Sequence, residues 1–340
     1  MSPLLLGAGL LGGAAAALGL GYRGRVRGPF EATRYVWSRG LALLCDHNGG
    51  VCFVKGQRGG RAAMRFDPAL FDQVRDGDLV WMRLIALPQF VEEALPRIKA
   101  RFALVTGDED WAIPSGFPGS ELLLSDSRVA CWFTQNFDGT VQNDKLMPLP
   151  IGLDFHTISN GRKWGHWPAT PAVQEAELEA LRARAQPNAE RLLKVHADFH
   201  FNKHKSQVWG DDRAAVQRAL EGNPSVQFQT AKVRRIELWR EKTRYAFVVS
   251  PHGNGLDCHR TWESLVLGNI VIVKRSSLDA LYDGLPVVIV DDWLEITDDN
   301  LRRWHGEHSA KFERPDVQER LTNRYWIERM RRIVAERLAG

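Results

Sequence analysis

The stretch that most constrains the fold is a series of short apolar runs late in the chain, at 247–249, 270–273 and 287–290. These runs are rich in Val and Ile and do not alternate with polar residues, which is typical of strands buried on both faces of a parallel sheet. A helical pattern lies between the first two runs. Gly268 suits the left-handed residue that closes such a helix, and we expect Asp257 to be its N-cap. The sequence therefore predicts a β-loop-α-β unit.

The loop and helix start of such a unit lie at the carboxyl edge of the sheet, where unpaired N–H groups and the helix dipole favour an anion. Arg260 and Glu263 stand three residues apart on the polar face of this helix. An arginine near a helix N-terminus is unfavourable unless a bound anion compensates it, and the glutamate is placed to accept both hydroxyls of a ribose. The pattern predicts a phosphate-bearing substrate; the alternative is a surface ion pair between the two residues.

The same stretch carries a resemblance to a known family. Residues 250–263 read SPHGNGLDCHRTWE, and residues 285–293 read LPVVIVDDW. These motifs resemble the donor-binding half of exostosin-like (family 47-type) glycosyltransferases, which transfer a sugar from a nucleotide-sugar donor and share the GT-B fold. The segments 132–136 and 148–154 also resemble bacterial members of that family. The motifs are specific for the superfamily and not for one reaction.

The resemblance implies that Arg260 and the loop Gly253–Gly255 meet the donor diphosphate and that Glu263 meets the ribose. A basic loop before a predicted helix at 212–220 adds a second anion site. The donor-site residues that we expect are Lys203, Lys205, Ser250, His252, Gly253, Asn254, Gly255, Asp257, Arg260 and Glu263.

The fold class that we expect is α/β, with two Rossmann-like domains facing across a cleft and helices at the C-terminal end. A chain of 340 residues with 44% hydrophobic residues is long enough for two cores. The expected division is an apolar segment at 1–28, an acceptor domain at 29–156, a linker and helix at 157–190, a donor-binding domain at 191–310, and helices at 311–340 that return to the first domain.

Periodicity places the individual elements. The expected strands are 41–45, 51–54, 79–84, 102–106, 129–134, 145–151, 192–197 and 226–229, in addition to the three named above. The expected helices are 88–100, 171–186, 212–220 and 235–245, followed by a helical region after Asp292.

The segment 3–22 carries no charge and is followed by Arg23, Arg25 and Arg27. Its length suits a membrane span, although its many glycines make it only weakly hydrophobic. The arginines would keep the rest of the chain in the cytoplasm. We expect membrane contact through 3–22, the alternative being a flexible or misassigned start.

An inverting transfer needs a base from the first domain, whereas a retaining transfer does not. The candidate bases are Asp108, Asp154 and His156, because each lies in a loop that follows a predicted strand. The acceptor-side candidates are Asp46, Asp110 and Asn136. Arg260 is expected to act electrostatically on the leaving diphosphate. For each loop carboxylate or histidine, a purely structural role as a cap is the alternative.

Several functions are not favoured. A net charge of +4 is too balanced to indicate nucleic-acid binding. The four cysteines show no paired spacing, and the loop lacks the third glycine of a dinucleotide fingerprint, so we expect neither a structural metal nor a cofactor.

The sequence thus predicts a cytoplasmic, metal-independent glycosyltransferase with a saccharide or glycan acceptor, acting in surface-polysaccharide or glycoconjugate synthesis. The alternatives are an epimerase or group transferase acting on a nucleotide sugar, and a non-catalytic nucleotide- or carbohydrate-binding protein.

Overall fold

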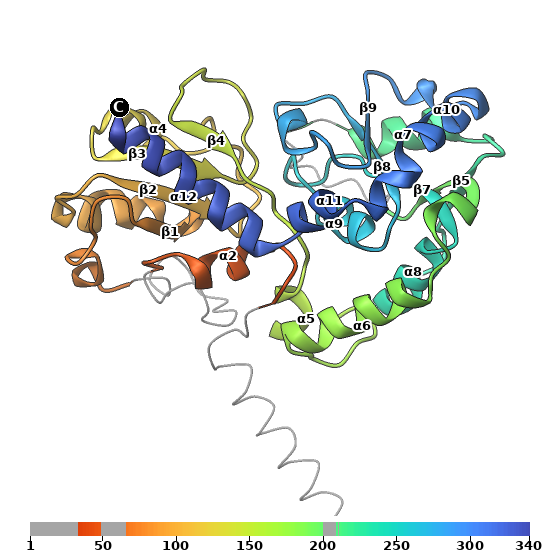
Figure 1. Cartoon of the computed structure of the whole chain (residues 1–340), viewed down its shortest axis with the longest axis horizontal. Helices are drawn as coiled ribbons and strands as arrows, with labels where there is room; N and C mark the ends of the chain where they lie inside the picture. The colour runs from red at the N-terminus through yellow and green to blue at the C-terminus, as the bar shows by residue number, and fades with distance from the viewer. Residues whose placement is uncertain (1–32, 49–65, 200–208, 210) are drawn as a thin grey trace, which may run out of the picture.

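The computed structural model describes residues 33–48, 66–199, 209 and 211–340. The apolar segment 3–22, the expected strand 51–54 and the two loop lysines at 203 and 205 lie outside these ranges. The described residues form two α/β bodies, each built on a parallel sheet, which lie side by side (Figure 1). This arrangement, with helices at the C-terminal end, confirms the expected fold class.

The first domain contains a four-stranded parallel sheet in the order β1-β2-β3-β4. Its strands are β1 (Leu79–Arg83), β2 (Phe102–Gly107), β3 (Val129–Thr134) and β4 (Leu146–Pro148), as the sequence predicted except that β4 is shorter. α4 (Ser120–Ser125) precedes β3. The expected helix 88–100 is broken into α3 (Leu87–Gln89), a π-helical turn (Phe90–Ala94) and a 3₁₀ turn (Leu95–Arg97).

The expected strand at 41–45 is wrong, because these residues belong to helix α2 (Ser38–Leu44). Leu41 and Ala42 are fully buried, whereas Leu44 is exposed. A short apolar run does not distinguish a strand from one turn of a buried helix, because both bury consecutive residues.

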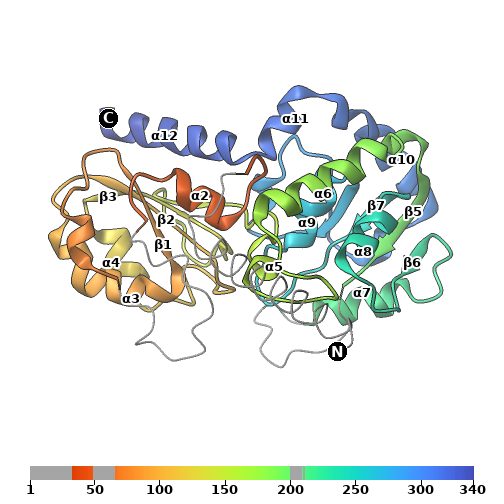
Figure 2. The ribbon, with the colours of Figure 1, turned by 90° about the horizontal axis from the view of Figure 1, so that it is seen from below.

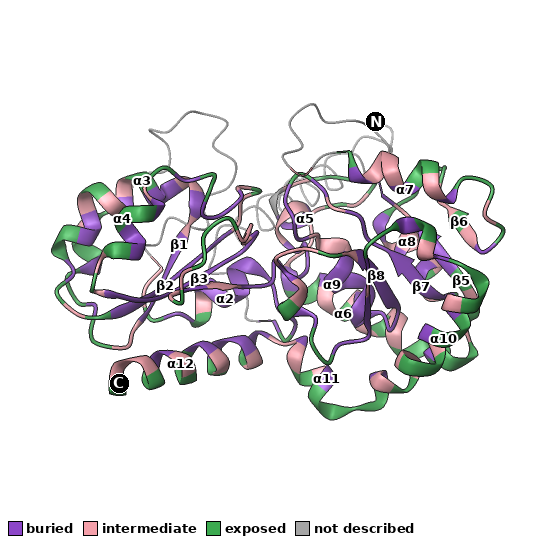
Figure 3. Cartoon of the chain, turned by 90° about the horizontal axis from the view of Figure 1, so that it is seen from above, coloured by how far each residue is buried: buried purple, intermediate pink, exposed green. Residues whose placement is uncertain are grey.

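The second domain contains a five-stranded parallel sheet in the order β6-β5-β7-β8-β9. Its strands are β5 (Leu192–Ala197), β6 (Val226–Phe228), β7 (Tyr245–Val249), β8 (Ile270–Lys274) and β9 (Val287–Val290). The main helices are α6 (Pro171–Arg184), α7 (Asp212–Leu220), α8 (Arg235–Lys242), α9 (His259–Val266) and α10 (Asp298–His308). Most strands of the two sheets are largely buried, whereas β6 at the edge of the second sheet has no buried residue (Figure 3).

The strand order of the second sheet reverses between β5 and β7, because β6 follows β5 on one side and β7 lies on the other. In open α/β sheets, ligands bind at such a reversal, outside the carboxyl ends of the strands. The fold therefore places the candidate site where the loops after β5 and β7 meet.

The chain crosses between the domains twice. The first crossing leads from β4 into α5 (His156–Asn160), and the second joins α11 (Pro315–Arg320) to α12 (Asn323–Ala339). α12 lies along the first domain (Figures 1 and 2), where Trp326 and Met330 pack in one core with Phe133 of β3. The return of the terminal helix to the first domain agrees with the sequence-based expectation.

Asp46 was predicted on the acceptor side, but the structure gives it a different place. Its carboxylate accepts hydrogen bonds from Leu79 N and from both terminal nitrogens of Arg331 on α12. Burial opposes ionisation, but these partners outweigh it and lower the pKa of Asp46. Asp46 therefore anchors α12, a role that the sequence did not indicate.

Candidate functional site between the domains

Two cavities open between the domains. The larger has a volume of about 520 Å³ and the smaller about 190 Å³. The larger is lined by the loops after β7 and β8 and by α7, including His252, Leu256, Lys274, Ser277 and Arg218, and by Asp138 of the first domain. The smaller is lined by Ser38, Arg83, Asp108, Glu109, Asp110, Ile151, His156 and His259. One loop, between β7 and α9, thus borders both cavities.

Arg260 lies at the reversal of strand order. Its Nε is 3.0 Å from Asp198 Oδ1, directly after β5, and its Nη1 donates to Ser250 Oγ and Pro251 O at 3.3 Å, directly after β7. The side chain is 12% exposed, so it is neither fully buried nor turned out to bulk solvent. Arg260 therefore lies at the carboxyl ends of β5 and β7, and its contact with a donor stays a prediction.

Positive charge exceeds negative charge around Arg260. Lys242 Nζ lies 2.8 Å from Asp198 Oδ2, and Arg213 of α7 donates to His252 O at 3.2 Å. Burial raises the pKa of Asp198, but Lys242 and Arg260 outweigh it and lower that pKa to about 2. Burial and the nearby charge of Arg260 lower the pKa of Arg213. Arg260 and Lys242 therefore pair with one buried carboxylate, and Arg213 lies near Arg260, an arrangement that an anionic ligand would balance.

The loop after β7 is docked on the first domain. Asn136, in the left-handed region at φ 53°, accepts a hydrogen bond from Asp257 N at 3.0 Å. A Cβ on Gly255 would lie 2.7 Å from the Asn136 side chain, so only glycine fits this approach. Asn136 was predicted to meet the acceptor, and the structure shows it holding the loop after β7.

Asp257 is not the N-cap of α9, as the sequence suggested. Cys258 takes that position, with no side-chain cap. The Asp257 carboxylate instead accepts from Ile151 N across the domain boundary and from Trp262 Nε1. Burial raises the pKa of Asp257 to about 6, because these neutral donors only partly offset the loss of water. The helix therefore begins at His259, one residue later than the sequence predicted.

Gly255→Ala should therefore weaken the contact between the domains. We expect a loss of about 1–3 kcal/mol in the free energy of unfolding, because the methyl group displaces Asn136. Chemical denaturation followed by circular dichroism measures this. Gly306→Ala is the matched control: a Cβ there meets nothing within 4 Å, and we expect unchanged or slightly raised stability. Equal stability of the two variants would contradict the tight docking of this loop.

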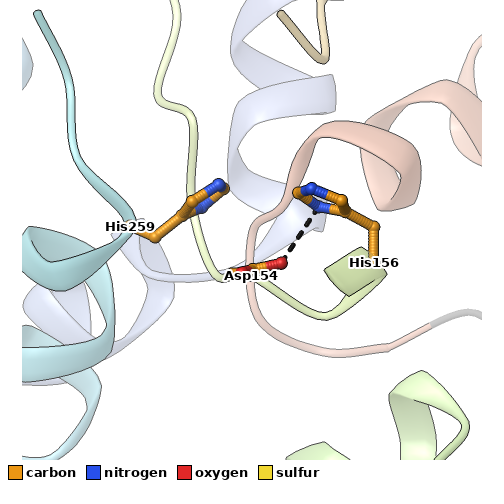
Figure 4. Close-up of side chains that lie close together, drawn as sticks. All are labelled: Asp154, His156 and His259. Carbon is orange, nitrogen blue, oxygen red and sulfur yellow. Dashed lines mark ion pairs between the residues drawn. The ribbon is translucent and has the colours of Figure 1, made fainter. Parts of the chain in front are cut away.

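Asp154, His156 and His259 converge at the smaller cavity (Figure 4). His156 Nδ1 lies 3.1 Å from Asp154 Oδ1, and His259 Nδ1 is 2.7 Å from Gly152 O. Each ring therefore has its Nδ1 engaged, which leaves the Nε2 nitrogens as the acceptors. Burial and nearby positive charge lower the pKa of His156 although Asp154 and Asp108 oppose this, so the ring is neutral at neutral pH.

These three residues could also hold a divalent ion, because their donor atoms lie within 4.8 Å of one another. Imidazole and carboxylate ligands suit zinc and other first-row transition metals. This cluster could not be predicted from the sequence, since His259 comes from the second domain and the other two residues from the crossing after β4.

Asp108 is held by two arginines. It accepts from Arg39 Nε at 3.1 Å, and Arg83 Nε lies 3.2 Å away. Burial raises the pKa of Asp108, but the charges of Arg39, His156 and Arg83 outweigh it, so that pKa is lowered. Asp108 is therefore a weaker candidate base than His156. Its neighbour Asp110 lines the same cavity, and its acceptor-side role stays a prediction.

Like Arg260, Glu263 lines neither of the two cavities. It is buried, and its Oε2 accepts from Trp239 Nε1 of α8 at 3.0 Å. The two residues share a helix but project to different neighbours, since Arg260 reaches the end of β5. The ribose contact of Glu263 stays a prediction.

Other predicted donor residues belong to the loop after β7 itself. Ser250 Oγ is 2.9 Å from Thr261 Oγ1, and His252 Nδ1 is 2.9 Å from Leu256 O. Asn254 is exposed. Sequence reasoning missed Asp198, Arg213 and Lys242. The position of Asp198 directly after a predicted strand was the one signal that could have indicated it.

Comparison with known proteins identifies no family. No family model and no curated protein matches the sequence. Among solved structures, an α,α-trehalose-phosphate synthase from Burkholderia vietnamiensis shows 14% identity and a TM-score of 0.41, with 82% of each chain covered. The N-terminal domain of a Candida albicans trehalose-6-phosphate phosphatase shows 12% identity and a TM-score of 0.43, covering 84% of this chain and 77% of that one. At these values the similarity identifies neither a family nor an activity.

Proposed function

We propose that this protein is a glycosyltransferase of the exostosin-like type, which moves a sugar from a nucleotide-sugar donor to a saccharide or glycan acceptor. The observation that carries the proposal is the gathering of positive charge at the reversal of strand order, where Arg260 and Lys242 pair with Asp198 and Arg213 lies near Arg260. A diphosphate bound there would balance this charge.

The donor diphosphate is assigned to the loop after β7. Arg260 and Arg213 would meet its oxygens, and the N-terminal N–H groups of α9 would face the same charge. Because negative charge on the diphosphate grows as the glycosidic bond breaks, fixed guanidinium groups stabilise the transition state more than the bound donor. Lys203 and Lys205 are proposed to assist from the loop after β5.

The acceptor is assigned to the smaller cavity, beside His156. Asp154 holds the Nδ1–H of His156, so Nε2 can accept a proton from the acceptor hydroxyl as it attacks the anomeric carbon. The assignment of His156 as a base applies to a transfer that inverts the anomeric carbon. The polar wall formed by Asp108, Glu109 and Asp110 suits the hydroxyl groups of a sugar.

The proposal is tested by incubating the protein with a panel of nucleotide sugars and a mixed glycan acceptor, and following nucleoside diphosphate release. A transferase releases diphosphate and extends the acceptor. Consumption of donor without acceptor would point to an epimerase or another group transferase. Binding of a nucleoside diphosphate with no turnover of any donor would assign a non-catalytic role.

Chelation should leave the transfer rate unchanged, because arginine, lysine and helix N–H groups supply the positive charge in this mechanism. The measurement compares rates after dialysis against EDTA with rates after adding back Zn²⁺, Mn²⁺ or Mg²⁺. Loss of activity on chelation with recovery on metal addition would contradict this and would make Asp154, His156 and His259 metal ligands.

A further inference from the structure

A tight hairpin between α5 and α6 presents two tryptophans on the surface. Lys163 and His166 exchange both backbone hydrogen bonds, which leaves Trp164 and Gly165 as the two turn residues, both at positive φ. Such a turn favours Asn or Gly, so a tryptophan at φ 50° is strained. Trp164 is 39% exposed and Trp167 is 74% exposed. Large exposed aromatic side chains on a strained turn indicate a contact surface.

Basic residues surround these tryptophans. The Arg162 guanidinium lies 4.8 Å from the centre of the Trp167 ring, and Lys163 Nζ lies 5.7 Å from that of Trp164. The hairpin packs on the segment before α8, because Ile236 N donates to His166 Nε2 and a Cβ on Gly165 would meet the Arg234 side chain.

We call residues 161–168 and 231–234 the tryptophan-basic face. It carries Arg162, Lys163, Trp164, Trp167, Lys232, Val233 and Arg234 and no acidic residue. Among the described residues, Arg162, Lys163 and Lys232 form no ion pair, whereas Arg234 pairs with Glu237. A surface that combines unneutralised basic groups with exposed tryptophans fits the interface of an anionic bilayer, where the indoles enter the headgroup layer.

The first residues that the structure describes contact α6, the helix that follows the hairpin. Arg34 N and Tyr35 N donate to the carboxylate of Glu175 on this helix. In Figure 1 the connection between α5 and α6 runs along the lower edge of the molecule. Ten residues, 23–32, lie between the end of the uncharged segment 3–22 and Thr33, a reach on the order of 35 Å when extended. A bilayer that holds that segment is therefore within reach of the tryptophan-basic face.

We propose that the tryptophan-basic face docks on a membrane surface that contains anionic lipids. None of the helices in the described part of the chain has the length and apolar character of a membrane-spanning segment. The contact is therefore interfacial, with Trp164 and Trp167 in the headgroup layer and the basic groups against lipid phosphates. The inference is independent of the proposed glycosyl transfer.

Hydroxyl-radical footprinting of the full chain tests this docking locally. The chain is mixed with vesicles of phosphatidylcholine alone or with added phosphatidylglycerol, and oxidation is measured by mass spectrometry. We expect anionic vesicles to protect Trp164 and Trp167 several-fold and neutral vesicles to protect them less, while Leu294, which is 65% exposed, stays unchanged. This readout is local, so attachment through 3–22 alone does not mimic it.

Two double variants complete the test. Arg162→Glu with Lys163→Glu should lower partitioning onto anionic vesicles at least about tenfold. Trp164→Gly, which tolerates the positive φ, with Trp167→Ala should weaken binding to both kinds of vesicle. Unchanged melting temperatures show that the variants are folded. Tryptophans that are oxidised equally with and without vesicles would overturn the proposal, as would protection by soluble oligosaccharides and not by vesicles.

Discussion

Arg260→Ala should lower the rate of sugar transfer by about 10²–10³-fold or more while the protein stays folded. The guanidinium is the group that links the ends of β5 and β7, through Asp198 and Ser250, at the reversal of strand order. Its loss removes charge from the place where the departing diphosphate becomes more negative. Asp198 keeps its contact with Lys242 in this variant, so no buried carboxylate is left alone.

Arg260→Lys tests whether a positive charge at this position is sufficient without the planar guanidinium. Lysine keeps the positive charge but not the planar fork that binds two phosphate oxygens, so we expect only partial recovery. Arg303→Ala, an exposed arginine on α10 paired with Glu307, is the matched control and should have the rate of the unmodified protein. Steady-state rates and melting temperatures are measured for all three. A full rate in the Arg260→Ala variant would remove the assignment of the donor site.

His156→Ala should lower the transfer rate by about 10²–10⁴-fold, because the acceptor hydroxyl loses its base. The unprotonated form of His156 is favoured because burial, which has the largest effect, and nearby positive charge lower its pKa. Activity should therefore persist into mildly acidic solution and fall only as the pH drops through this lowered pKa. Donor binding should be retained, which separates a lost base from a collapsed cleft.

Asp154→Asn tests the interaction between Asp154 and His156 by changing the carboxylate. The carboxylate stabilises the protonated ring, so its removal should lower the pKa of His156 further and move the acidic limb of the pH–rate profile to lower pH. The rate itself should also fall, because an amide can hold the wrong tautomer. A reduced rate with an unmoved acidic limb would contradict the role of His156 as the base.

The sequence was most informative where local pattern decides the structure. Val287–Val290 and Ile270–Lys274 are buried on both faces, and their uninterrupted apolar character predicted parallel strands. The prediction for Arg260 rested on the same kind of pattern, since a polar residue at the start of a helix that follows a buried strand lies at the sheet edge.

The remaining features depend on tertiary contacts. Asp257 looked like a helix cap because the sequence does not show Ile151 N, which lies in the other domain. The sequence did not indicate His259 as a site residue, because its neighbours in the structure, Asp154 and His156, lie about a hundred positions away along the chain. Residues that meet across a domain boundary leave no periodic signal in either segment.

The most direct test of the account is calorimetric titration with nucleoside diphosphates and the corresponding monophosphates. If Arg213, Arg260 and the loop after β7 hold a diphosphate, at least one nucleoside diphosphate should bind about tenfold or more tightly than its monophosphate, since each charge-assisted contact contributes about 1.5–3 kcal/mol. Arg260→Ala should abolish this difference. Equal affinity for the two nucleotides, or a preference for diphosphate that survives the loss of Arg260, would contradict the central claim.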